Sequence, residues 1–196
     1  MIQARGSLSR WSTKRVKAVS SCGGTTAAST VPANGMIPRM AKQETPLIRP
    51  GRIVRELSES EAAALATAWL AVYGQRGQGM NLKSYLWHVF SGGGYESLSG
   101  KDALAAYATR EAPEYLVLSN DRRTAFVTEL RTDWTYLSDY FVFPPNLAWT
   151  MAFTHEDGWL GPYFATHPDV ERLEAESLAQ IRKQREIEKA RAKGWA

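Results

Sequence analysis

The residues best suited to chemistry lie in one short stretch, residues 154–158, which reads Thr-His-Glu-Asp-Gly. A histidine on an apolar surface with carboxylates beside it can act as an acid or base near neutral pH, or bind a metal. His155 and Glu156 are therefore the candidate catalytic residues. The same residues suit a turn, because carboxylates accept hydrogen bonds from loop amides and glycine allows positive φ. We favour this structural role for His155, ahead of contact with a partner and of catalysis or metal binding.

The better-known catalytic signatures are absent from the sequence. The three histidines lack the H-E-x-x-H spacing of zinc sites, and the single cysteine excludes a cysteine pair: His88, His155 and His167, with Cys22. Residues 94–101 look like a phosphate-binding loop, but five residues separate its glycines instead of four. Asp102 also stands where Ser or Thr would reach magnesium. The sequence therefore predicts no metal and no cofactor.

Two helices are predicted ahead of the strands that must position these residues. Residues 58–73 begin with a capping box, Ser58 and Glu61, which precedes an Ala- and Leu-rich run. Residues 100–110 are predicted to form the second helix. The apolar run between them, residues 85–90, is too short for its periodicity to separate helix from strand, and we interpret it as helix.

After Pro113 the chain consists of short β-rich runs divided by turn residues, as in antiparallel sheets. Two hairpins are predicted, one from residues 115–119 and 124–130 and the other from residues 141–143 and 148–155. Two prolines in the second turn cannot continue a ladder, because proline lacks the amide hydrogen. The four runs therefore predict an antiparallel sheet of about four strands.

The last predicted strand is expected to place His155 beside a buried face. Its period of two puts Trp149, Met151 and Phe153 on one side of the sheet. His155 follows in the same phase, so we expect its ring on the side that carries Trp149. Asp139, near another strand end, reads as a residue that forms a turn.

A long helix is predicted from Pro168 to about Lys193, with acidic residues at its start and basic residues at its end. These signs complement the helix macrodipole, so the basic end is interpreted as a solvated face. The apolar stripe ends halfway, and we expect residues 182–196 to be a frayed, charged helix end. The fold class predicted is α+β, with helices packed on the antiparallel sheet and a long C-terminal helix.

Charge divides the chain into two parts. Residues 1–43 carry seven basic residues and no acidic one, and they lack the apolar periodicity of a folded segment. We interpret them as a disordered basic extension. Either the true start of the protein is Met36 or Met40, or the extension is an organellar leader. Residues 44–196 hold 17 basic and 20 acidic residues, a net charge of −3, and are predicted to form a single domain. An acidic domain argues against nucleic-acid binding as its main function.

Aromatic side chains supply the remaining candidates for a binding site. Seventeen aromatic residues lie between Tyr85 and Phe164, and most must be core, because burying each ring stabilises the fold by about 2 to 3 kcal/mol. The candidate binding residues are those in the two histidine-containing aromatic segments: Trp87, His88, Trp149, Asp157 and Tyr163. No apolar run is long enough to cross a bilayer, which excludes a membrane-spanning class.

Two blocks of sequence carry a resemblance to a known family. The first is Y-L-W-H-V-F-S at residues 85–91, followed by L-x-G-x-x-A-x-x-A-Y at residues 98–107. The second joins W-T-M-A-F-T-H-E-D at residues 149–157 to G-P-Y-F at residues 161–164. They resemble an uncharacterised bacterial domain family of unknown function. The resemblance implies a small cytoplasmic α+β domain, and it transfers no catalytic role because the family has no assigned activity.

Two hypotheses for function follow. The first is a cytoplasmic protein-binding domain, immunity-like in neutralising a basic protein partner such as a toxin nuclease, because the domain is acidic and lacks catalytic signatures. The alternative is a hydrolase-like or metal-dependent enzyme that uses His155 and Glu156. Reaction, partner identity and oligomeric state are not specified by the sequence.

Overall fold

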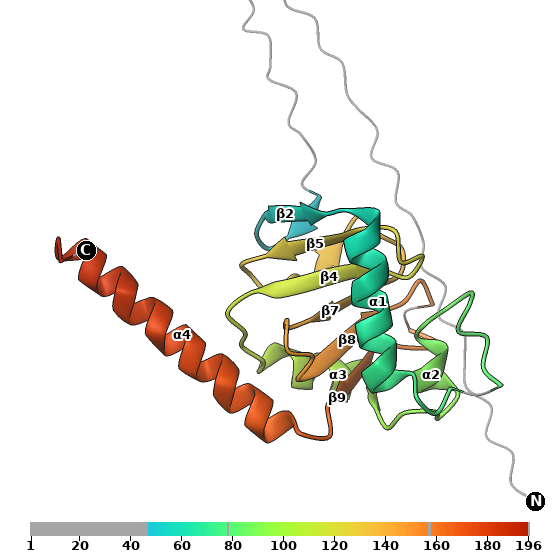
Figure 1. The fold of residues 1–196 in the computed structure, drawn as a ribbon. Helices are drawn as coiled ribbons and strands as arrows, with labels where there is room; N and C mark the ends of the chain where they lie inside the picture. Colours follow the sequence, from blue (N-terminus) through green and yellow to red (C-terminus); the bar gives the residue numbers. More distant parts are fainter. Residues whose placement is uncertain (1–46, 78, 157, 196) are drawn as a thin grey trace, which may run out of the picture. The chain divides into compact units, whose positions relative to one another are not determined.

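The structure is a computed structural model of the chain, and it describes residues 47–77, 79–156 and 158–195 (Figure 1). The basic extension expected at residues 1–43 lies outside the described residues. The elements of the first half are β1 (Ile48–Arg49), β2 (Ile53–Leu57), α1 (Glu59–Tyr73), α2 (His88–Ser91), β3 (Leu98–Ser99) and α3 (Gly100–Ala108). Those of the second half are β4 (Tyr115–Ser119), β5 (Ala125–Thr128), β6 (Trp134–Thr135), β7 (Tyr140–Phe143), β8 (Trp149–Phe153), β9 (Tyr163–Thr166) and α4 (Val170–Ala192).

The main sheet has seven strands in the order β2-β5-β4-β7-β8-β9-β3, and every neighbouring pair is antiparallel. A separate two-stranded sheet pairs β1 with β6. The α+β class and the C-terminal helix are confirmed, whereas the expectation of about four strands is wrong. The four predicted strands are β4, β5, β7 and β8, which lie together in the centre of the sheet.

The missed strands of the main sheet lie at its two sides and are short or lack alternation. β3 has two residues, and β9 has four residues that follow Gly161-Pro162. β2 reads Ile-Val-Arg-Glu-Leu, which has no period of two, and three of its five residues are exposed. Such strands gain their stability from pairing with a neighbour, so their local sequence carries little signal.

The capping box places α1 over one face of the sheet. The side chain of Ser58 accepts a hydrogen bond from the backbone of Glu61, and the Glu61 carboxylate accepts one from the backbone of Ser58. The buried residues of α1 recur at helical spacing: Ala62, Ala66, Trp69 and Tyr73. Trp69 contacts the rings of Phe90 and Phe141, and its Nε1 donates to Thr150 Oγ1 at 2.9 Å. One indole therefore joins α1 to α2, β7 and β8.

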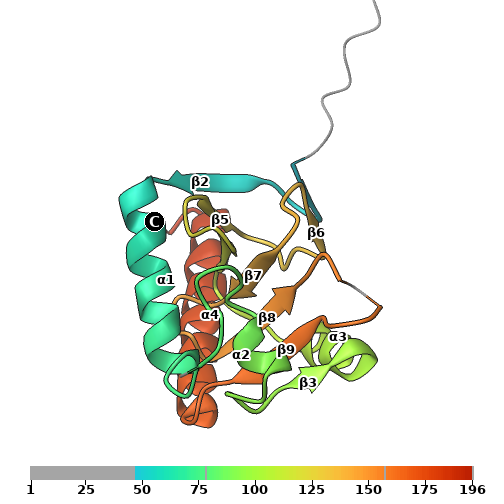
Figure 2. The same ribbon diagram turned by 90° about the vertical axis from the view of Figure 1, so that its right-hand side faces the viewer.

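The opposite face of the sheet has its own core. Figure 2 shows α1 on one side of the sheet and α3 with β6 on the other. Tyr107 of α3 packs against Trp149 and Phe153 of β8, and its hydroxyl donates to the carbonyl of Thr132 at 2.7 Å. Burial raises the pKa of Tyr107 well above its usual value. The alternation of β8 thus divides its side chains between two cores, as its sequence predicts.

The buried residues of α4 all lie in its first half: Leu173, Ser177 and Ile181. In its second half, the exposed Arg185 pairs with Glu111 at 3.7 Å. Asn146, in the β7–β8 turn, donates to the carbonyl of Leu173 at 2.8 Å and lies 3.0 Å from Ser177 Oγ. The helix then projects away from the sheet towards its C-terminal end (Figure 1). Across the described part of the chain, none of the helices combines the length and apolar character needed to cross a bilayer.

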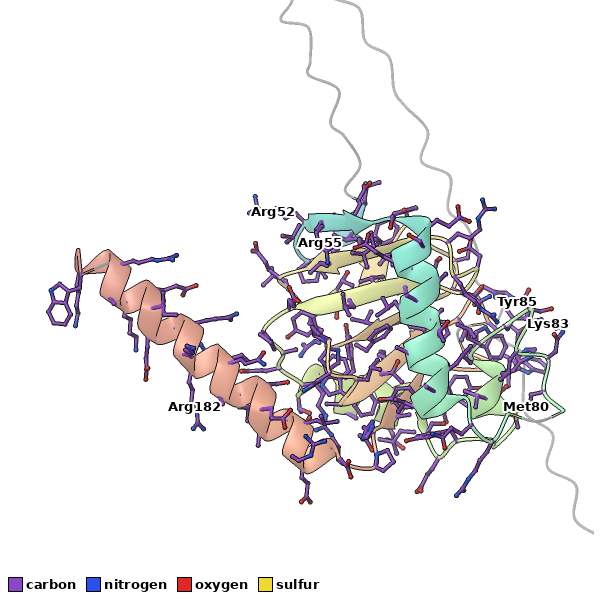
Figure 3. All side chains as sticks on the ribbon, in the orientation of Figure 1. Arg52, Arg55, Met80, Lys83, Tyr85 and Arg182 are labelled. Carbon is purple, nitrogen blue, oxygen red and sulfur yellow. The ribbon has the colours of Figure 1, made fainter. Side chains whose placement is uncertain are left out.

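The edge strand β2 is protected by charge. Arg52 and Arg55 lie along this edge (Figure 3), and they pair with Glu129 at 3.6 Å and Glu61 at 3.1 Å. Charged side chains on an edge strand disfavour pairing with a strand from another chain. The opposite edge, β3, has only two residues. Neither edge offers a long apolar strand for a partner to extend.

Candidate functional site

The sheet register brings Asp139 to His155. Tyr140 of β7 pairs with Phe153 of β8, so the residue before β7 meets the residues that follow β8. The Nδ1 atom of His155 lies 2.9 Å from both carboxylate oxygens of Asp139, and the backbone N–H of His155 donates to Asp139 Oδ1 at 3.0 Å. One carboxylate therefore fixes both the backbone and the ring of His155.

This carboxylate also favours the charged form of the ring. The hydrogen bond to Asp139 and its negative charge raise the pKa of His155, partial desolvation opposes the shift, and nearby Glu156 adds to it. Glu156 Oε1 lies 3.7 Å from Nε2. The His155 side chain is 41% exposed, whereas that of Asp139 is only 11% exposed. His155 is thus an exposed ring whose charged form is favoured by the largely buried carboxylate of Asp139.

An aromatic wall supports the other side of the imidazole. The ring centroid of His155 lies 5.4 Å from that of Tyr85 and 6.3 Å from that of Trp87. These residues come from the segment between α1 and α2, where Figure 3 labels Tyr85. Trp87 belongs to the core under α1, while Trp149 belongs to the other core. The expectation that His155 lies on the Trp149 side is wrong, because β8 ends at Phe153 and its alternation stops there.

Trp87 is the centre of this aromatic cluster. Its ring contacts His88 edge-on at 4.5 Å and stacks with Tyr163 at 6.3 Å. Trp87 is fully buried, and its Nε1 has no hydrogen-bond partner among the described residues. Desolvation is the main cause that raises the pKa of the Tyr163 hydroxyl. The cluster gives His155 an apolar support.

The β8–β9 loop, residues 154–162, carries an unusually exposed side chain. Thr154 Oγ1 donates to the carbonyl of Leu160 at 2.6 Å, and the backbone N–H groups of Trp159 and Leu160 both donate to the carbonyl of Glu156 at 2.9 Å. Gly161 has a φ of +107°, and a Cβ there would lie 2.9 Å from Thr154 Oγ1, so glycine is required. Trp159 is nevertheless 86% exposed.

The structure gathers most of the predicted site residues and separates one. His155, Glu156, Trp87, His88 and Tyr163 share one corner through the contacts given above. Of the remaining two candidates, Trp149 is buried in the other core, and Asp157 is outside the described residues.

Sequence reasoning missed three contributors to this corner: Tyr85, Asp139 and Trp159. For Asp139 a signal existed. In a hairpin, the residue before the first strand faces the residue after the second, so a carboxylate there could have been matched with His155. For Trp159 no periodic pattern distinguished an exposed tryptophan from a core one.

The corner can support acid–base chemistry. An imidazole held through Nδ1 by a carboxylate is the arrangement of a general base. Within residues 47–195, gaps aside, no hydroxyl hydrogen-bonds to His155. No three His, Cys, Asp or Glu side chains of that part of the chain gather to hold a metal ion.

Comparison with known proteins gives one match. The family model described as a domain of unknown function, DUF4275, covers residues 67–164, which is half of the chain and includes the whole corner around His155. No curated protein and no solved structure matches the chain significantly. The resemblance to a domain family of unknown function is thereby confirmed, and the chain belongs to the DUF4275 family.

Proposed function

We propose that the chain is a protein-binding domain whose contact surface is centred on the β8–β9 loop. The observation that carries the proposal is Trp159, 86% exposed on a loop closed by three internal hydrogen bonds. Fully burying a large aromatic side chain stabilises by about 2 to 3 kcal/mol, and here that contribution is left for association. Tryptophan is also among the residues most enriched in the energetic centres of protein interfaces.

Charge indicates the kind of partner. Residues 44–181 carry 11 basic and 18 acidic residues, a net charge of −7, while residues 182–196 carry six basic and two acidic residues. Glu156 belongs to the loop, Asp139 lies beside it, and Asp157 belongs to the loop in sequence. Complementary charge speeds encounter and fixes orientation, so the surface suits a basic protein. An immunity-like role, neutralising a cationic partner such as a nuclease, fits this distribution.

Binding through side chains suits the domain better than strand addition. The edge strand β2 is lined by paired arginines, and β3 is too short to offer a template. The only cysteine is Cys22, so residues 44–196 use no disulfide, which fits binding in the cytoplasm.

The proposal is tested by placing a photo-crosslinking amino acid, p-benzoylphenylalanine, at position 159 of the full chain in the native host. Position 195 provides the matched control, because Trp195 is 80% exposed but lies at the end of α4. We expect one discrete protein adduct from position 159, with a basic partner identified by mass spectrometry, and none from position 195. A charge reversal, Glu156→Lys, should remove the adduct. Equal patterns from both positions, or no adduct from position 159, would contradict the proposal.

A second function is favoured by one observation, the hydrogen bond from His155 Nδ1 to Asp139. This pair would serve a hydrolase-like enzyme as its general base, with Nε2 facing the substrate. The enzyme hypothesis expects His155→Ala to abolish hydrolysis in a screen of ester and phosphoester substrates while the melting temperature stays nearly constant. It is refuted if the wild-type chain and the His155→Ala variant give the same rates across the screen.

A further inference from the structure

A cavity of about 860 Å³ lies at the far end of β9 from the β8–β9 loop. It forms where the last turn of α1, residues 94–98, α3 and the junction between β9 and α4 meet. Its volume is in the range of pockets that hold small molecules, which span roughly 300 to 1,000 Å³. Nothing in the proposed protein-binding function uses this cavity.

One part of the cavity wall is apolar. Side chains from four separate segments supply it: Val72, Leu98, Phe164 and Val170. Phe164 belongs to β9 and is itself buried, stacking with Trp149 in the core at 6.1 Å. The wall is therefore anchored in the sheet, and it suits the hydrocarbon part of a ligand.

The edge of β9 contributes a backbone donor. β3 pairs with β9 only as far as Leu98 and Phe164, so Thr166 lies beyond the end of β3. The backbone groups of Thr166 face the same outer edge as those of Phe164, and the Thr166 carbonyl accepts the Tyr95 hydroxyl at 2.8 Å. The N–H of Thr166 has no acceptor among the described residues, and the residue lines the cavity. An unpaired strand edge of this kind readily donates to a ligand.

His167 adds a side-chain donor of defined tautomer. Its Nδ1 accepts a hydrogen bond from the backbone N–H of Asp169 at 2.9 Å. A nitrogen that accepts carries no proton, so the neutral ring holds its proton on Nε2. No described residue accepts from Nε2, and His167 lines the cavity.

Arg110 supplies positive charge at the same place. Its Nη1 donates to Glu174 at 2.5 Å, and its guanidinium lies 5.4 Å from the centre of the Phe164 ring. These two contacts hold the side chain in place, while its buried Nε has no hydrogen-bond partner among the described residues. Two exposed residues that line the cavity, Arg76 and Glu96, offset one another in charge. Asp169 is paired with Arg172 at 3.6 Å.

The geometry points to a binding site for a small organic anion, a carboxylate or phosphate monoester carried on an apolar body. Three donors line one cavity, from Thr166, His167 and Arg110, and each lacks an acceptor within the described chain. The anionic group accepts from these donors, and the hydrocarbon part packs against Phe164 and its neighbours. Hydrogen bonds to an ionised acceptor are about twice as strong as neutral ones, so an uncharged analogue binds more weakly.

The test is an NMR titration of the full chain, labelled with ¹⁵N, using hexanoate, hexyl phosphate and the uncharged hexanamide. We expect saturable shifts of the Thr166 and His167 amide signals with at least one anion, and at least about tenfold weaker binding of hexanamide. The anion that binds more tightly identifies the ligand as a carboxylate or a phosphate ester. Absence of saturation with both anions, or equal affinity for hexanamide, would overturn the proposal.

Substitutions inside and outside the cavity test whether the anion binds there. Arg110→Gln should weaken anion binding about tenfold, whereas Arg123→Gln should not change it. Arg123 is the matched control, because its guanidinium also pairs with a glutamate, Glu59 at 2.8 Å, but does not line the cavity. Ala71→Trp fills the cavity from an exposed position on α1 and should abolish binding without touching Arg110. If Arg110→Gln unfolds, Ala71→Trp decides alone, and wild-type affinity in that variant rejects the site.

Discussion

The two ends of the β8–β9 pair each hold a histidine, and they hold it in opposite ways. His155 donates from Nδ1 to the carboxylate of Asp139, whereas His167 accepts at Nδ1 from the backbone N–H of Asp169. The first arrangement raises the pKa of His155 and favours its charged form, while the second places the proton of the neutral His167 ring on Nε2. The group that contacts Nδ1 therefore decides what each histidine offers: a surface ring whose charged form is favoured at one end, and an Nε2 donor in a cavity at the other.

The largest effect on stability is expected from removing a large side chain of the core. Trp69→Ala removes a fully buried indole and its hydrogen bond to Thr150 of β8, and should lower the free energy of unfolding by about 3 to 5 kcal/mol. Trp159→Ala removes an exposed indole and should change it by no more than about 0.5 kcal/mol. Urea unfolding followed by circular dichroism measures both. Similar losses in the two variants would contradict the described difference in burial.

Gly161→Ala should disturb the β8–β9 loop and leave the cavity at the other end of β9 unchanged. Positive φ and the approach of Thr154 predict a loss of about 2 to 3 kcal/mol in the free energy of unfolding. Gly158→Ala is the control, since Gly158 has a φ of +89° but open space around its Cβ position, and it should lose only about 1 kcal/mol. Amide spectra should change around His155 and stay constant at Thr166. Equal losses for both glycines would show that the contact with Thr154 is unimportant.

Asp139→Asn should alter how the free energy of unfolding depends on pH, because it removes the carboxylate that favours the charged form of His155. The pKa of His155 is raised in the folded chain, so its stabilising contribution is fully present below its unfolded pKa of about 6.5 and is lost as pH rises through the folded pKa. The variant should therefore differ from wild type more in acid than in alkali, when urea unfolding is compared at pH 6 and pH 9. The pKa of His155, followed by NMR, should fall in the variant. A difference in stability that is independent of pH would argue against the ion pair.

The sequence predicts the centre of this fold better than its margins. The capping box at Ser58 and Glu61 identifies α1, and two pairs of β-rich runs joined by short turns identify the four central strands. β9 is as long as β5 and β7, but it was missed, like the two-residue β3, because it belongs to no such pair: the longer loop of residues 154–162 separates it from β8. Their omission also concealed the cavity, which exists because β3 ends before Thr166.

The candidate site was predicted in part for a related reason. His155, Glu156, Trp87, His88 and Tyr163 could be selected by residue type, and the structure brings them to one corner. Asp139 depends on the register between β7 and β8, which a list of strands does not specify. Exposure also depends on the tertiary fold, so nothing in the sequence separates Trp159 from the buried tryptophans.

The most direct test of this account is the tautomer of each histidine ring, measured by long-range ¹H–¹⁵N NMR correlation at a pH where both rings are neutral. We expect the proton on Nδ1 in His155, because Asp139 accepts from it, and on Nε2 in His167, because Asp169 donates to Nδ1. Observation of the same tautomer at both positions would contradict the assignment of a charged surface to one end of the β8–β9 pair and a donor-lined cavity to the other.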